Sequence, residues 1–268
     1  MNAVQRFANH PTPTRADANP TRRLIGGVLG LGRHRVAVPI DQIDLTVEPA
    51  LAESWEFSNG GKTITFHLRD GIKYSDGVPI KAEDFVYAFK RVLNPETASP
   101  YNFLLTDIKG ASEFNSAEVP TDTAKLPELE KAVGVSAPDD KTFVVELEHP
   151  ATYFIDICAL WNTTPLRKDV IEKFGEQWTD PANYPTSGPF MLKSWEHQSK
   201  IVLVPNPNYW GPKPTLTEIQ MSMIVEPKAE FEAYKAGELD ICNQVLDADI
   251  PAIKADPVLS KEFGTVPA

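Results

Sequence analysis

Two acidic pairs and a serine–glycine motif come nearest to catalytic patterns in this 268-residue chain. Adjacent carboxylates, as at residues 83–84 and 139–140, support acid–base chemistry only where a cleft holds them at a set separation. Residues 139–140 lie just before a strand-like run, which favours a solvated turn. The Ser-Gly-Pro of residues 187–189 lacks the Gly-x-Ser-x-Gly pattern of a nucleophile elbow, and its proline would block the helix that an elbow requires. We therefore predict no catalytic residues and no enzymatic activity.

Cysteine and histidine usage argues against a metal site. The two cysteines, Cys158 and Cys242, form no Cys-x-x-Cys frame, and the five histidines include no His-Glu-x-x-His pattern. We predict no metal and no cofactor. Each cysteine lies in an apolar stretch, which favours a buried small side chain, and a disulfide between the two is left open.

Composition narrows the possible partners. The chain is 42% hydrophobic and carries a formal net charge of -11, so it has enough apolar residues for a substantial core and a surface that repels polyphosphate. Nucleic acid is therefore excluded as a partner. No apolar stretch approaches the length of a membrane-spanning helix, so we expect a chain that is not itself membrane-spanning.

The first 43 residues differ in kind from the rest. They are rich in proline and polar residues and have neither helical nor strand periodicity, so we expect this segment to be disordered or loosely attached. Residues 21–32, TRRLIGGVLGLG, imitate the start of an export signal. The run is short, charged residues follow at once and no clean cleavage site follows, so an export signal is not clearly present.

Regular patterns begin at Val47. Residues 54–58 and 62–68 are strand-like runs separated by Asn59-Gly60, a pair that accepts the positive φ of a hairpin turn. Residues 82–93 predict a helix, because apolar side chains recur at i, i+3, i+4 and i+7. Further strands are predicted at 142–147, 190–196, 200–205, 217–225 and 238–243, and further helices at 151–160, 167–175, 227–237 and 247–256. Strands and helices mix without strict alternation, which indicates an α+β or mixed α/β class.

Aromatic residues near turns offer the best candidates for a binding surface. Rings that lie in or beside such turns are Tyr101, Trp161, Trp178, Trp195, Tyr209 and Trp210. We expect most of them to fix loops onto the core, Trp55, Trp195 and Trp210 above all. A minority can line a ligand groove, because a rigid ring supplies contact area at low entropy cost.

Six separated motifs occur in one order from Val47 to the end: PALAESWEFS, TFHLRDGIKYSDGVPIKAEDFVYAFKRVLNPETASPY, HPATYF, EKFGEQWTDPANYPTSGPF, KIVLVPNPNYW and KAGELDI. In this series the chain resembles the peptide-binding class of extracytoplasmic solute-binding proteins, the receptors of oligopeptide and dipeptide ABC transporters. The resemblance implies a periplasmic-binding-protein-like fold, short peptides as ligands, an ABC transporter membrane permease as partner, and a periplasmic or cell-envelope location.

The resemblance also implies a ligand site. In the family, the tyrosine of the Ser-Pro-Tyr motif faces bound peptide, the loop after the HPATYF helix lines the cleft, and polar residues after the GELDI strand contact the ligand backbone. The positions implicated here are Tyr101, Leu160, Trp161, Asn162, Asn243 and Gln244. Trp161, Asn162 and Gln244 differ in type from the oligopeptide receptors, so their assignment rests on position.

Family members are about twice as long, and residues 1–43 have no match in them. We therefore expect the first lobe only, without the second: a small α+β subdomain at 44–167 and the central part of a larger mixed-sheet subdomain at 168–268. Such a truncated receptor would bind weakly alone, because one wall leaves the ligand in water. The alternative is a protein-interaction or chaperone-like module that uses an exposed cleft wall and an open sheet edge. Some relatives bind nickel complexes or sugars, so the ligand class is open.

Overall fold

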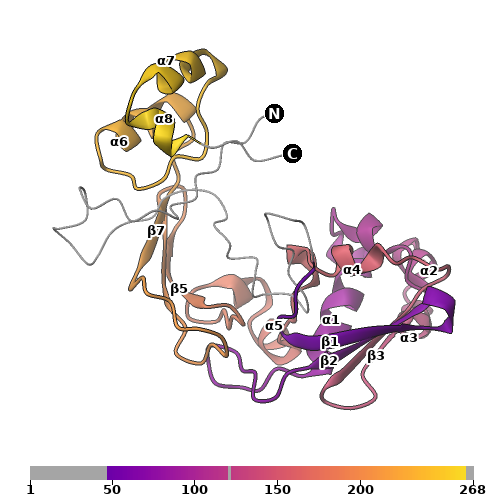
Figure 1. Cartoon of the computed structure of the whole chain (residues 1–268). Helices are drawn as coiled ribbons and strands as arrows, with labels where there is room; N and C mark the ends of the chain where they lie inside the picture. Colours follow the sequence, from indigo (N-terminus) through magenta and orange to yellow (C-terminus); the bar gives the residue numbers. More distant parts are fainter. Residues whose placement is uncertain (1–46, 120–121, 264–268) are drawn as a thin grey trace.

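The computed structural model describes residues 47–119 and 122–263 (Figure 1). The predictions for residues 1–43, including the stretch that imitates an export signal, lie outside the described residues. Among the described residues, no helix is both long and apolar enough to cross a membrane. Strands and helices are mixed, so the predicted fold class is confirmed.

A four-stranded antiparallel sheet forms the first region. Its strands, in the order β1-β2-β4-β3, are β1 (Ala52–Ser58), β2 (Thr63–Leu68), β4 (Thr142–Glu146) and β3 (Val135–Ser136). The predicted β1–β2 hairpin is confirmed. Its turn is a short 3-10 helix, η2 (Asn59–Gly61), in which Asn59 has φ of 51° and Gly60 has φ of 65°. Asparagine and glycine tolerate this left-handed backbone, which explains why the turn falls there.

The main core lies between this sheet and helix α1 (Ala82–Leu93), whose bounds match the prediction. The alternation of β2 places Ile64, Phe66 and Leu68 on one face, each at most 3% exposed. From α1, Phe85 and Phe89 bring their rings within 5.5 and 5.1 Å of the Phe143 ring on β4, measured between centroids. Aromatic packing at such distances adds to the free energy gained by burying the rings.

Short helices complete the first region. They are η3 (Pro95–Thr97), η4 (Asn102–Leu105), α2 (Ala111–Asn115), α3 (Leu126–Ala132), α4 (Phe154–Ile157) and η5 (Trp161–Thr163). Phe114, Phe154 and Cys158 extend the core into these segments with at most 1% exposure.

The second region contains a three-stranded antiparallel sheet and a helical end. The elements are α5 (Lys168–Phe174), η6 (Gly175–Thr179), β5 (Phe190–Glu196), β6 (Lys200–Pro205), β7 (Ile219–Ser222), α6 (Pro227–Lys235), η7 (Asp247–Asp249), α7 (Ile250–Ala255) and α8 (Leu259–Glu262). Figure 1 shows the sheet β5-β6-β7 running from the vicinity of α5 to helices α6, α7 and α8, which gather at the end of the molecule away from α1.

A second, smaller core lies within this helical end. It consists of Phe231, Tyr234, Leu239, Cys242 and Ile253, each 4–8% exposed. The two cysteines are buried, one in each core, which confirms the prediction that both are buried side chains. They form no disulfide, which answers the question left open by the sequence.

The strand predicted at residues 238–243 is wrong. The described segment between α6 and η7 pairs with no strand. Leu239, Ile241 and Cys242 are buried, and Leu239 and Cys242 belong to the small core around α6. The apolar residues therefore reflect packing against helices, and a strand needs a neighbouring strand to satisfy its backbone groups. The subdomain boundary expected between residues 167 and 168 stays a prediction.

Candidate functional site

Two of the predicted site residues, Tyr101 and Trp161, lie in direct contact. Their ring centroids are 5.4 Å apart and the ring planes meet at 89°. Tyr101 is 39% exposed and Trp161 is 59% exposed, so this edge-to-face pair lies at the surface. Aromatic rings favour this geometry, because the positive edge of one ring meets the negative face of the other.

The loop that carries Tyr101 is shaped by local hydrogen bonds. The side-chain oxygen of Asn94 accepts from the Glu96 backbone N–H at 2.8 Å and begins η3 directly after α1. Ala98 then adopts φ of 48°, which turns the chain, and the Ser99 hydroxyl oxygen accepts from the Tyr101 N–H at 3.3 Å. The Asn-Pro and Ser-Pro pairs of the sequence therefore end α1 and present the ring.

The loop that carries Trp161 is anchored by a buried hydroxyl. Thr163 is 1% exposed, and its hydroxyl lies 2.9 Å from the carbonyl oxygen of Cys158 and 2.7 Å from that of Leu160. Because Cys158 belongs to the main core, this contact fixes η5 to the core while Trp161 stays exposed. Leu160 itself is half-buried.

Asn162, the neighbour of Trp161, carries an unusual amide. Its side-chain oxygen and nitrogen are both shielded from solvent, and neither has a hydrogen-bond partner in the described structure. A buried polar group without a partner costs about 1–3 kcal/mol. This amide therefore carries a desolvation cost that no hydrogen bond offsets in the described structure.

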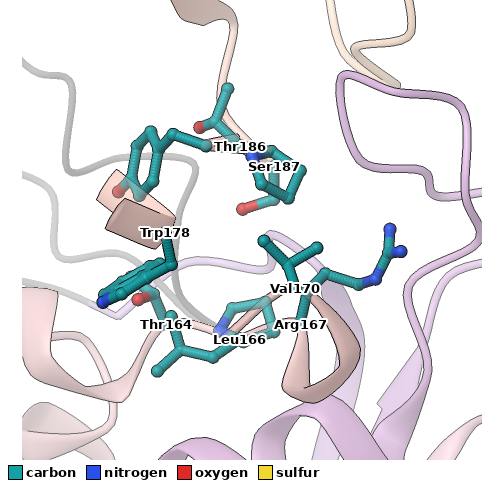
Figure 2. A pocket seen from close by; sticks show the side chains of 10 residues that line it. Thr164, Leu166, Arg167, Val170, Trp178, Thr186 and Ser187 are labelled. Atoms are coloured by element: carbon teal, nitrogen blue, oxygen red, sulfur yellow. The ribbon is translucent and has the colours of Figure 1, made fainter. Parts of the chain in front are cut away.

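The same stretch of chain continues into a hollow lined by Thr164, Leu166, Arg167, Val170, Trp178, Thr186 and Ser187, with Pro165, Tyr184 and Pro185 completing it (Figure 2). The enclosed space is about 20 Å³, which is enough for one water molecule. Sequence reasoning did not identify the hollow, although its last residues belong to a motif that carried the family resemblance.

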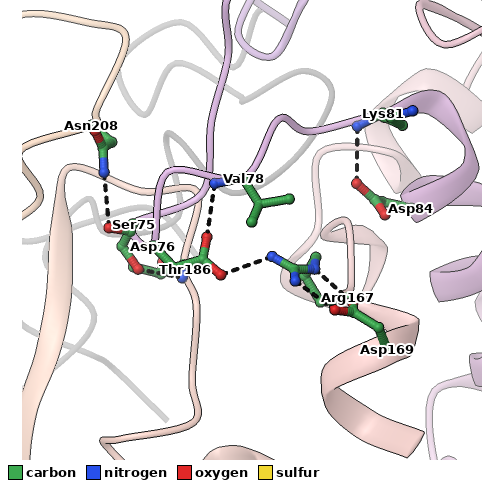
Figure 3. Close-up of polar contacts among 9 residues, drawn as sticks. All are labelled: Ser75, Asp76, Val78, Lys81, Asp84, Arg167, Asp169, Thr186 and Asn208. Carbon is green, nitrogen blue, oxygen red and sulfur yellow. Dashed lines mark hydrogen bonds and ion pairs between the residues drawn. The ribbon is translucent and has the colours of Figure 1, made fainter.

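Arg167 connects this hollow to the loop before α1 (Figure 3). Its guanidinium donates to Asp76 at 2.8 Å and forms a two-point contact with Asp169, at 2.7 Å from Nε and 2.6 Å from Nη2. The Arg167 side chain is only 12% exposed. Hydrogen bonding to Asp169 raises the pKa of Arg167, and the same contact lowers the pKa of Asp169.

Ser75 makes a second set of contacts across the same junction. Its backbone N–H donates to the Thr186 carbonyl at 2.8 Å, and its hydroxyl oxygen accepts from the Thr186 N–H at 3.1 Å. The Asn208 side chain donates to the Ser75 carbonyl at 2.9 Å. Together with Arg167, these contacts fix the first region against the three-stranded sheet. They join residues 91 to 133 positions apart, so no local sequence pattern could reveal them.

The remaining predicted residues, Asn243 and Gln244, lie in the helical end. The Asn243 backbone N–H donates to the Glu230 carboxylate of α6 at 2.8 Å, and the Gln244 carbonyl accepts from the Cys242 thiol at 3.1 Å. In Figure 1, α6 and α4 lie at opposite ends of the molecule. The structure therefore divides the predicted set into two groups, Leu160–Asn162 with Tyr101, and Asn243 with Gln244.

The acidic pairs have structural roles. Asp139 is exposed, and its carboxylate accepts from the backbone N–H groups of Lys141 and Thr142, both at 2.8 Å, so the predicted solvated turn is confirmed. Asp84 accepts from the Lys81 N–H at 2.9 Å at the start of α1. In the described parts of the chain, no three histidine, cysteine or acidic side chains gather as a metal would require. The arrangement offers aromatic faces and amide groups, which suit non-covalent binding.

Comparison with known proteins gives a consistent result. The family described as "Bacterial extracellular solute-binding proteins, family 5 Middle" matches residues 46–267. The periplasmic oligopeptide-binding protein OppA of Escherichia coli (strain K12) is 35% identical over 96% of this chain and 46% of its own length. "Probable deoxycholate-binding periplasmic protein YgiS" of the same strain is 34% identical over 94% of this chain and 45% of its own length.

A solved structure, the E. coli murein tripeptide binding protein MppA, superposes with a TM-score of 0.74 at 28% identity, over 90% of this chain and 46% of that protein. The chain thus spans about half the length of the relatives that it matches, as the prediction of one lobe requires.

Proposed function

The chain belongs to the family-5 bacterial extracellular solute-binding proteins, and from this premise we propose that it binds oligopeptides for an ABC transporter. The observation that carries the proposal is the exposed contact of Tyr101 with Trp161 beside the unpaired amide of Asn162. The names of the relatives, which include oligopeptide-binding and murein tripeptide-binding proteins, support the same ligand class.

The geometry suits a peptide in a specific way. A peptide combines side chains of varied size with a main chain that has one donor and one acceptor per residue. Exposed rings such as Tyr101 and Trp161 offer contact area to side chains of many shapes. The Asn162 side chain has a donor and an acceptor that would match a main-chain amide, and both are shielded from solvent in the described structure. Asn243 and Gln244 form the second part of the proposed site, on the helical end.

We propose that residues 44–167 and 168–268 are the two subdomains of one lobe and that binding to this chain alone is weak. The described residues supply one wall of the proposed site, so with this chain alone the hydrogen bonds of a bound peptide compete with water. A membrane permease as partner, a periplasmic or cell-envelope location and the absence of enzymatic activity belong to the same proposal. The periplasmic names of the E. coli relatives support that location.

Two alternatives have specific support. One relative is named as a probable deoxycholate-binding protein, which supports a steroid-like ligand as the first alternative. Exposed aromatic rings can also pack against such a ligand. A protein-interaction or chaperone-like module is supported by β7, an edge strand of its sheet that is followed by Met223 and Val225, 38% and 88% exposed. An unpaired edge next to apolar side chains is a template for another chain.

Titration followed by nuclear magnetic resonance tests the proposal, because it detects weak binding. Trialanine added to the full chain is expected to shift resonances of Tyr101, Trp161 and Asn162 with an affinity no tighter than millimolar. Tyr101→Ala should weaken this binding, whereas Phe57→Ala should not. Phe57 is a fair control because it is also 39% exposed but lies on β1.

Each alternative predicts a different result. Binding of deoxycholate without binding of any peptide would favour the steroid-like ligand. Association into larger species without peptide binding would favour the interaction module. Micromolar peptide affinity would contradict the argument that one wall binds weakly.

A further inference from the structure

Exposed aromatic side chains are concentrated on two short segments. In the described residues, the exposed aromatic side chains are Phe57, on β1, and a group formed by Tyr101, Phe103, Tyr153 and Trp161. We call the group of four the aromatic face. Its members are 39–61% exposed, although rings of this size are usually at least half-buried in a monomeric protein.

The two segments of the aromatic face lie side by side. The Tyr101 and Trp161 rings are in contact, and the Tyr153 hydroxyl donates to the Asp107 carboxylate at 2.6 Å. Residues 101–107 and 153–161 are therefore joined at two points. The Thr106 hydroxyl also donates to the Phe103 carbonyl at 2.9 Å, which stabilises the turn that presents Phe103.

The charges carried by the two segments that form this face have one sign. Residues 94–108 and 150–166 contain Glu96, Asp107 and Asp156 and no lysine or arginine. The flanking bases are engaged elsewhere: Lys109 pairs with Glu146 at 3.2 Å, and Arg167 pairs with Asp76 and Asp169. The last turn of α1 supplies Lys90 and Arg91, which are both half-buried, and His149 lies 3.5 Å from Asp107.

Exposed ring faces next to carboxylates favour a positively charged ligand. In an edge-to-face pair, the ring that presents its edge keeps both faces clear of its partner, and the other ring keeps one. An exposed ring face attracts a cation through its quadrupole, and the surrounding carboxylates attract the same charge at longer range. An anionic side chain would meet negative ring faces and carboxylates together.

We propose that the aromatic face binds the lysine or arginine side chain of a peptide, with Trp161 as the main cation-binding ring. This inference rests on the proposed peptide-binding function and adds a charge preference to it.

Matched tripeptides test the charge preference. The full chain is titrated at low ionic strength with Ala-Lys-Ala, Ala-norleucine-Ala and Ala-Glu-Ala. Binding of each peptide is monitored by nuclear magnetic resonance. Norleucine keeps the length of the lysine side chain and removes its charge. Ala-Lys-Ala is expected to bind about two- to fivefold more tightly than Ala-norleucine-Ala, as one exposed cation–π contact provides, and Ala-Glu-Ala is expected to bind most weakly.

A Trp161→Leu variant tests the ring assigned to the cation. It keeps an apolar side chain but less contact area, so both peptides should bind more weakly and the advantage of Ala-Lys-Ala over Ala-norleucine-Ala should disappear. Phe57→Leu, the matched control, should keep that advantage. Circular dichroism establishes that both variants are folded.

The outcomes separate this inference from the function on which it rests. Equal affinity for the lysine and norleucine peptides would overturn the charge preference and leave peptide binding intact. A preference that persists in Trp161→Leu would overturn the role of Trp161. Failure of all three peptides to bind would overturn the proposed function together with this inference.

Discussion

The cores at the two ends of the molecule differ in how deeply their side chains are buried. Around the four-stranded sheet, large side chains such as Phe66, Phe85 and Phe143 are 0–1% exposed. In the helical end, the core residues are 4–8% exposed and border a hollow of about 30 Å³. Deeply buried and closely packed side chains contribute more free energy than side chains at the rim of a small cluster. The first region therefore closes its own core, and the helical end leaves its apolar side chains partly open.

Element length explains part of the difference. Helix α1 has 12 residues and packs along a sheet, whereas α6, α7 and α8 have nine, six and four residues. Helices this short are marginal in water and depend on tertiary packing. The two parts of the proposed binding site therefore lie on cores of different size. Tyr101 and Trp161 lie beside the large core of the first region, and Asn243 and Gln244 lie beside the small core of the helical end.

The largest expected effect separates the two cores. Phe143→Ala removes the ring that contacts Phe66, Phe85 and Phe89, and we expect a loss of about 3–5 kcal/mol in the free energy of unfolding of the first region. Phe231→Ala in the helical end should cost less, because its surroundings are more open. Urea unfolding of both variants, followed by circular dichroism, measures the two losses. Equal losses would show that the cores do not differ as described.

A smaller effect is expected at the junction between the regions. Arg167→Met removes the guanidinium that binds Asp76 and Asp169, and a loss of about 1–3 kcal/mol follows from hydrogen bonds to charged groups. Lys168→Met is the matched control, since its ion pair with Glu172 is exposed on both sides and such pairs contribute about 0–1 kcal/mol. Thermal unfolding compares the two variants. A Lys168 variant as unstable as the Arg167 variant would contradict a specific role for the junction.

The smallest effect concerns acid pH. Arg167 lowers the pKa of Asp169 below its usual 3.8, so the ionised carboxylate stabilises the fold above that pH. This contribution is lost as pH falls through the lowered value. Asp169→Asn should therefore be less stable than the native chain at pH 6 and approach its stability as pH falls below the lowered pKa. A stability difference that is constant with pH would rule out this electrostatic role.

The pKa of Asp84 is shifted in the opposite direction from that of Asp169. Burial raises its pKa above 3.8, so its ionised form is disfavoured in the folded chain, and its contribution decreases as pH rises above that value. A full pH profile of unfolding therefore sums these two groups and the other carboxyls with shifted pKa values, among them Asp122, Asp139 and Asp256. The comparison of Asp169→Asn with the native chain isolates the contribution of Asp169.

Sequence reasoning succeeded where structure is local. The hairpin at Asn59-Gly60 and the bounds of α1 follow from turn chemistry and from the helical spacing of Phe85 and Phe89. It failed at residues 238–243, because a run of apolar residues can be buried either in a strand or against helices, and here it packs against helices. The junction around Arg167 was missed for another reason: its partner Asp76 lies 91 residues earlier, and only the fold brings the two together.

The candidate site stays a prediction. The contact of Tyr101 with Trp161 agrees with their joint assignment, although the roles of both residues stay a proposal. The unpaired amide of Asn162 has no counterpart in sequence, because burial and partners exist only in three dimensions. Leu160, Asn243 and Gln244 were placed by resemblance alone.

Each core holds one cysteine that forms no disulfide, Cys158 in the first region and Cys242 in the helical end. Burial raises the pKa of Cys158, which makes it unreactive until its surroundings open. The rate at which a thiol-modifying reagent reacts with each cysteine therefore measures the local opening of each region separately, in a single unlabelled sample. The order in which the two thiols react would rank the local opening rates of the regions without any substitution in the chain.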